Sequence, residues 1–128
     1  VNMTDQTATS DPNNLRMIRN LVNYTGPGSR ATGTAVVLEA GHNSAYPRCF
    51  DTRAETEIVN EGFTFARLAN DDVPLPAANV KVLILCLPRI AYSRAEINRF
   101  KQFSAEGGRL IFVGEHSGFY GAGIPIQN

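Results

Sequence analysis

The chain has 128 residues and a mass of 13.9 kDa, which fits one domain and is too short for two of ordinary size. With 43% hydrophobic and 19% charged residues, it is neither a disordered tail nor a collagen-like repeat nor a disulfide-stapled miniprotein. Twelve basic residues balance twelve acidic ones, so we expect no nucleic acid partner and no anionic membrane partner. The longest apolar run, Val82 to Leu87, is far shorter than the roughly 20 residues that a membrane span requires.

Residues 1–33 are predicted to form an N-terminal arm, a helix and a linker. Asp11 can accept hydrogen bonds from the free amides of a first helical turn, and Pro12 is well tolerated at the first helical position. Apolar residues then recur at helical spacing, which predicts a helix over Pro12–Tyr24. A glycine- and proline-containing segment from Gly26 ends the helix and leads to the next element.

From Thr34 the pattern becomes that of an alternating α/β protein. Thr34–Ala40 is a short apolar, β-branched run, typical of a strand buried on both faces of a sheet. Thr52 and Glu55 have the spacing of a capping box, which predicts a helix over Arg53–Glu61 with a glycine as its stop. The alternating segment Phe63–Leu68 predicts a second, more exposed strand.

The second half of the chain repeats this order. Val80–Leu87 is almost continuously apolar and is predicted to be the central strand. Ser93 and Glu96 form another predicted capping box, and the helix ends at a glycine pair before the strand Arg109–Val113. A glycine-rich turn, Gly114 to Gly123, follows. The predicted buried stripe of the helix consists of Ile97, Phe100 and Phe103.

Strand, helix and strand in repetition predict an α/β fold, because right-handed crossovers place helices on both faces of a parallel sheet. We expect a flavodoxin-like, three-layer α/β/α arrangement with a mostly parallel sheet of about four strands in the order 2-1-3-4, preceded by an N-terminal helix. The topological switch point then lies between the first and third strands. A ligand crevice is expected beside the C-terminal ends of these strands.

Residues 35–128 contain four segments that recur in a known family: AVVLEAGHN, a helix ending in EGF, VKVLILCLPR and SRAEINRFKQFSAEGGRLIFVGEHSG. On these segments the chain resembles the class I glutamine amidotransferase-like superfamily, and within it the uncharacterised and trehalose-utilisation-type branches. The resemblance implies that residues 34–128 form an amidotransferase-like α/β domain, which we expect to be incomplete at its C-terminus. These segments are specific for the fold and much less so for an activity.

The resemblance argues against glutaminase chemistry. Catalytic members carry a nucleophilic cysteine in a sharp turn after the strand that corresponds to Arg109–Val113. The turn here reads Gly114 to Gly118 and contains no cysteine. The catalytic histidine and glutamate of such enzymes would follow beyond Asn128, and Cys86 stands near the end of a strand and not on an elbow.

Polar residues follow the predicted strands at the edge where the crevice is expected. Glu39 lies there too, and the candidate ligand-binding residues are His42, Asn43, Arg89, Glu115, His116 and Ser117. Tyr46, Phe119 and Tyr120 could line the same crevice and stack on a sugar ring, or simply cover the sheet edge. The expected ligand is a small polar molecule or a carbohydrate. We expect no cofactor.

Two chemical alternatives remain for these polar residues. Imidazole and carboxylate groups are good zinc ligands, which would make His42, Glu115 and His116 a metal site. Ser117 could be a nucleophile with His116 or His42 as its base and Glu115 as a further catalytic candidate, although the turn does not match the G-x-S-x-G pattern. Ordinary hydrogen-bonded loop residues are the alternative to both sites.

The favoured function is that of a noncatalytic ligand-binding or protein-interaction module. The last predicted strand has no following element to cover it, so we expect a homo-oligomer or an adjoining domain. Cys49 and Cys86 could form a disulfide in an oxidising compartment, with a free buried thiol at Cys86 as the favoured interpretation. A secreted or cell-envelope location is slightly favoured. The alternative function is a hydrolase or metal-dependent enzyme acting on a small polar or sugar substrate.

Overall fold

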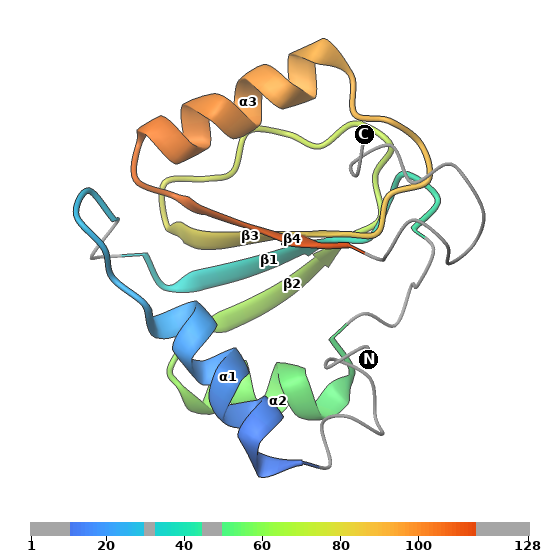
Figure 1. Cartoon of the computed structure of the whole chain (residues 1–128). Coiled ribbons are helices and arrows are strands. Elements are labelled where there is room, and N and C mark those ends of the chain that lie inside the picture. Colours follow the sequence, from blue (N-terminus) through green and yellow to red (C-terminus); the bar gives the residue numbers. More distant parts are fainter. Residues whose placement is uncertain (1–10, 30–32, 45–49, 115–128) are drawn as a thin grey trace.

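Four parallel strands form a single sheet in the order β2-β1-β3-β4, as the sequence predicted (Figure 1). The structure is a computed structural model that describes residues 11–29, 33–44 and 50–114. Its elements are α1 (Pro12–Asn23), β1 (Ala35–Glu39), α2 (Thr52–Asn60), β2 (Thr64–Leu68), β3 (Val80–Cys86), α3 (Arg94–Ala105) and β4 (Arg109–Val113). The switch point therefore lies between β1 and β3.

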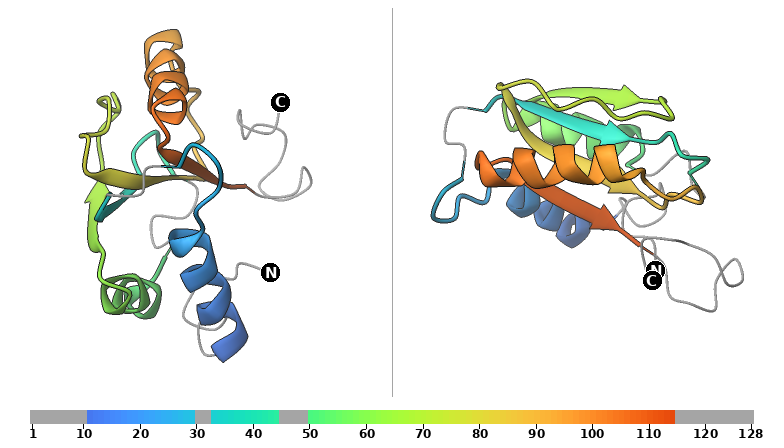
Figure 2. Two further views of the ribbon diagram at one scale, coloured as in Figure 1. Left: turned by 90° about the vertical axis from the view of Figure 1, so that its left-hand side faces the viewer. Right: turned by 90° about the horizontal axis from the view of Figure 1, so that it is seen from above.

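Helices cover both faces of the sheet and create two hydrophobic cores. α1 and α2 lie on one face and α3 lies on the other (Figure 2). Because side chains alternate along a strand, Ile84 of β3 packs toward α1 and α2, whereas Leu83 and Leu85 pack toward α3. Every residue of β3 is buried, which confirms that it is a central strand covered on both faces.

α1 is part of the first core. The Asp11 side chain accepts a hydrogen bond from the backbone N–H of Asn13 at 2.8 Å, and Pro12 occupies the first turn. Ile18 and Val22 are fully buried against the sheet and α2. At the other end of α1, the guanidinium of Arg109 donates hydrogen bonds to the carbonyl oxygens of Leu21 and Tyr24, which would otherwise lack helical partners.

The start of α2 differs from the predicted capping box. Asp51 is the capping residue, and its carboxylate accepts a hydrogen bond from the backbone N–H of Ala54 at 3.1 Å. Thr52 is already helical, and Glu55 bonds Arg67 on β2, with 2.6 Å between Oε1 and Nε. An aspartate one residue earlier satisfies the same free amides, so the helix begins one residue sooner than predicted.

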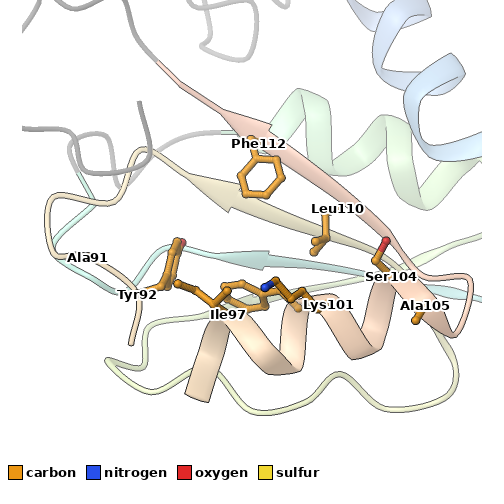
Figure 3. Close-up of a pocket in the computed structure, with 9 residues that line it drawn as sticks. Ala91, Tyr92, Ile97, Lys101, Ser104, Ala105, Leu110 and Phe112 are labelled. Atoms are coloured by element: carbon orange, nitrogen blue, oxygen red, sulfur yellow. The ribbon is translucent and has the colours of Figure 1, made fainter. Parts of the chain in front are cut away.

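The start of α3 confirms its capping box, but its buried stripe differs from the prediction. Ser93 accepts from the N–H of Glu96, and the Glu96 carboxylate accepts from the N–H of Ser93. Phe100 and Phe103 are buried as expected. Ile97 is 42% exposed, because it lies at the margin of the helix where no described element covers it (Figure 3).

None of the described helices is long and apolar enough to cross a membrane.

Cys86 ends β3 in the first core and is disulfide-bonded. The expectation of a free thiol at this position is therefore wrong. A buried thiol packs well without a partner, so burial alone could not separate the two states. Cys49, the other cysteine of the chain, lies outside the described residues.

Candidate functional site

A buried cluster of ionisable side chains lies at the C-terminal end of β1. The imidazole of His42 is placed between two carboxylates, with 3.3 Å from Nδ1 to Glu39 Oε1 and 3.1 Å from Nε2 to Glu96 Oε1. The phenol of Tyr92 donates a hydrogen bond of 2.5 Å to the second oxygen of Glu39. His42 is 2% exposed and the two glutamates are equally inaccessible. We call these four residues the His42 cluster.

The turn after β1 brings His42 into this position. Gly41 lies so close to the backbone of Asn70 that a Cβ atom would stand 2.1 Å from the carbonyl oxygen. His42 and Asn43 both have a left-handed backbone, with φ of 52° and 49°. The carbonyl oxygen of His42 accepts hydrogen bonds of 3.0 Å from the backbone N–H groups of residues 89 and 90, which hold the turn against the chain that follows β3.

Glu96 connects the cluster to α3 and to the loop before β3. Its carboxylate accepts backbone hydrogen bonds from Val73 at 2.9 Å and from Ser93 at 2.8 Å. The ring of Tyr92 lies 4.5 Å from the His42 ring and 5.0 Å, edge-on, from the Phe100 ring, measured between centroids. The cluster therefore ties together three segments that are distant in the sequence.

The surroundings shift the pKa values of two members of the cluster. Both ring nitrogens of His42 face carboxylate oxygens, of Glu39 and of Glu96. Burial alone would raise the pKa of Glu96, but hydrogen bonds from Val73 and Ser93 and the nearby His42 lower it below its ordinary value. Burial, the hydrogen bond to Glu39 and the charges of both glutamates raise the pKa of the Tyr92 phenol, which stays neutral.

These properties suit the His42 cluster to a structural task. Neither ring nitrogen of His42 is available as a general base, because each is engaged with a carboxylate. Within residues 11–29, 33–44 and 50–114, no group of three histidine, cysteine, aspartate or glutamate side chains could hold a metal ion. At the described part of the switch point, these side chains occupy the space where a ligand was expected.

The structure brings together only part of the site predicted from the sequence. Glu39 and His42 meet, as their positions at one strand end indicated. Asn43 and Arg89 are exposed, and the backbone N–H of Arg89 is what contacts His42. Six further candidates lie outside the described residues: Tyr46, Glu115, His116, Ser117, Phe119 and Tyr120.

Two members of the His42 cluster were not predicted from the sequence. Glu96 was assigned to the cap of α3, and it does form that cap, but its carboxylate also reaches His42. Tyr92 had no assigned role. The available signal was its position just before a capping box that follows a central strand, since such a residue lies close to the switch point of an α/β sheet.

An open apolar groove lies between α3 and β4, and Tyr92 of the His42 cluster is one of the residues that line it (Figure 3). Its volume is about 690 Å³. Phe112 on β4 is 55% exposed, and with Ile97 it gives the groove a large apolar surface open to solvent. No carboxylate stands among the described residues that line it, and its one charged side chain is that of Lys101. The main lining residues are Tyr92, Ile97, Phe100, Lys101, Leu110 and Phe112.

β4 also forms an edge of the described sheet. It pairs with β3 on one side, where the carbonyl oxygen of Val113 accepts from the N–H of Leu87 at 2.9 Å. Backbone groups of successive residues in a strand point in opposite directions. The N–H and C=O groups of Leu110 and Phe112 therefore point away from β3, toward the outer edge.

The described residues thus present two different candidate sites. The His42 cluster is polar, buried and internally satisfied, whereas the α3–β4 groove is apolar and open. Of these two sites, the groove is the one that a ligand or partner can reach without rearrangement of the described residues. No protein-family model matches the chain, and no curated protein or solved structure matches it either.

Proposed function

We propose that this chain is a noncatalytic amidotransferase-like domain that acts as a ligand-binding or protein-interaction module through its α3–β4 groove. The observation that carries the proposal is the open apolar groove, with Ile97 and Phe112 exposed on either side of it. Contiguous exposed apolar surface of this kind marks binding sites on proteins, because leaving it in water costs free energy that a partner recovers.

The size of the groove supports this proposal. Ligand pockets in proteins have volumes of about 300–1,000 Å³, and the groove falls within that range. Full burial of a phenylalanine side chain contributes about 1.5–3 kcal/mol. More than half of Phe112 is still exposed, so a partner that covers it gains a large part of this free energy.

A hydrolase or metal-dependent enzyme receives less support. Such an enzyme would use His42 as a base or ligand, yet its ring is enclosed by Glu39 and Glu96. The other residues of that hypothesis, Glu115, His116 and Ser117, are outside the described part of the chain. No contact on the described residues favours catalysis over binding.

The family and the compartment belong to the same proposal. The strand order and the GH dipeptide after β1 are compatible with an amidotransferase-like domain. The disulfide at Cys86 favours a secreted or cell-envelope location, since disulfides persist in oxidising compartments. The open edge of β4 is the part of the sheet where a strand of another chain or of an adjoining domain could pair.

A fluorescent apolar probe tests the proposed binding surface. We expect anilinonaphthalene sulfonate to bind the folded protein saturably, because its rings fit the groove and its sulfonate can face Lys101. Phe112→Ser should weaken this binding about tenfold or more, as expected for the loss of one well-covered aromatic contact. Binding is measured by fluorescence titration, with near-ultraviolet circular dichroism to confirm that each variant is folded.

Val59→Ser is the matched control. Val59 is 53% exposed, almost as much as Phe112, but it lies on α2 at the opposite face of the sheet. This variant should bind the probe as the unmodified protein does. Equal loss of binding in both variants, or no loss in Phe112→Ser, would contradict the proposal.

A further inference from the structure

The outer edge of β4 and the groove beside it form one continuous recognition surface. We propose that its partner is an extended, acidic peptide segment of another protein, which adds to the sheet as a strand next to β4. This inference rests on the proposed function and specifies its partner. It is supported by the backbone of β4, by the side chains above it and by the charges on α3.

The backbone of β4 has outward-facing groups that can pair with another strand. The N–H and C=O groups of Leu110 and Phe112 point outward, and within the described part of the chain they have no hydrogen-bond partner. An extended peptide supplies donors and acceptors at matching spacing, as in other cases of strand addition to a sheet edge. The groups of Ile111, by contrast, point toward β3 and are already in the ladder.

The side chains above this edge predict the pattern of the partner. Leu110 and Phe112 both project toward α3, where they line the groove with Ile97 (Figure 3). Successive side chains of an added strand point to opposite faces of the sheet. Every second residue of the partner should therefore be apolar and enter the groove, and the residues between them face the other side.

The charges on α3 predict the sign of the charge that the partner carries. Arg94 and Lys101 lie two turns apart on the helix face that borders the groove, with Ile97 between them. Neither cation forms an ion pair within residues 11–29, 33–44 and 50–114, whereas three arginines elsewhere do, namely Arg19, Arg67 and Arg99. Carboxylates on the partner would complement these two unpaired cations.

The same charges disfavour a second copy of this chain as the partner. β4 has the sequence RLIFV, which carries the cation Arg109 and no carboxylate. A second copy joined edge to edge at β4 would therefore bring no carboxylate from that strand to Arg94 or Lys101. An acidic peptide supplies the opposite charge that such a copy of β4 lacks.

Peptide selection followed by amide exchange tests the inference. The intact, disulfide-bonded protein is used to select binders from a phage-displayed library of random linear peptides. We expect enriched peptides that alternate apolar residues and carry net negative charge. Hydrogen–deuterium exchange is then measured with and without a selected synthetic peptide. The amides of Leu110 and Phe112 should exchange quickly in the free protein and become protected by the peptide. The amide of Ile111 is protected in both states and is the internal control.

A charge reversal adds a readout that folding alone does not change. Lys101→Glu should weaken the binding of an acidic peptide roughly fivefold, as expected for one partly exposed ion pair. The same variant should bind more tightly a version of the peptide that has lysine in place of each glutamate. Higher salt should reduce the difference between the two peptides.

Each other outcome would overturn the inference. Selection of basic or neutral peptides, or no selection at all, excludes an acidic strand as the partner. Protection of Leu110 and Phe112 in the free monomer would show that the chain covers its own edge, and protection that depends on protein concentration would show a second copy. The probe titration separates this failure from that of the proposed function. If Phe112→Ser still weakens the binding of anilinonaphthalene sulfonate, only the acidic strand is excluded as the partner. If it does not, the groove is not the binding site and the proposed function fails as well.

Discussion

At the scale of single residues, His42 illustrates what the sequence could and could not predict. Its position just after a buried strand predicted that it would meet Glu39, and it does. The second carboxylate beside His42 belongs to Glu96, whose place in the sequence was already explained by the cap of α3. Nothing else in the sequence indicated that Glu96 also contacts His42. A side chain with two roles is predictable only for the role that its local pattern requires.

Removing His42 should be strongly destabilising. Without its imidazole, Glu39 and Glu96 face each other's charge in a site that water does not reach. Breaking a buried ion pair by removing one partner costs about 3–5 kcal/mol. We therefore expect His42→Ala to lower the free energy of unfolding by this amount in chemical denaturation. Adding Glu96→Gln should recover part of the loss, because it removes one uncompensated charge. A cost below about 1 kcal/mol would mean that the His42 cluster does not hold the fold.

Tyr92 should make the stability of the protein sensitive to alkaline pH. Its pKa is raised in the folded state, whereas the phenol of an unfolded chain ionises near pH 10. The raised value means that the stabilisation is fully present below pH 10 and is lost as the pH rises above it. The loss amounts to about 1.4 kcal/mol per pH unit for one proton. Unfolding free energies of Tyr92→Phe should lack this decline.

Tyr24→Phe is the control for this experiment, since the ring of Tyr24 is 62% exposed and has no contact with the His42 cluster. It should keep the alkaline decline of the unmodified protein. If Tyr92→Phe shows the same decline, the phenol of Tyr92 is not the group that couples pH to stability.

At the scale of elements, the strands were the most predictable part. The almost continuously apolar run of β3 is typical of a central parallel strand, which is covered on both faces. The helices were predicted through their caps, and the error at α2 arose because Asp51 and Thr52 are adjacent residues that both cap well. Ile97, which was predicted to be buried and is exposed, shows a different limit of sequence-based prediction. Apolar spacing shows which helix face is hydrophobic, but not whether a neighbouring element covers all of it.

At the scale of the whole molecule, the strand order could be predicted because right-handed crossovers leave few alternatives. The site could not be predicted in the same way. Polar residues at the strand ends indicated a crevice there, but in the described structure Glu39, His42 and Tyr92 fill that position with their own contacts. The accessible apolar surface lies instead between α3 and β4, where it depends on which elements are neighbours and not on any local motif.

The most direct test of the α3–β4 groove as the binding site is to map where a bound molecule contacts the folded protein. Amide proton–nitrogen correlation spectra are recorded as anilinonaphthalene sulfonate is added to the unmodified chain. We expect the largest shift changes at Lys101, Leu110 and Phe112, with little change at Gly41 or Asn43. Shifts concentrated at Gly41 and Asn43, with the groove unaffected, would contradict this expectation and return the binding site to the C-terminal ends of β1 and β3.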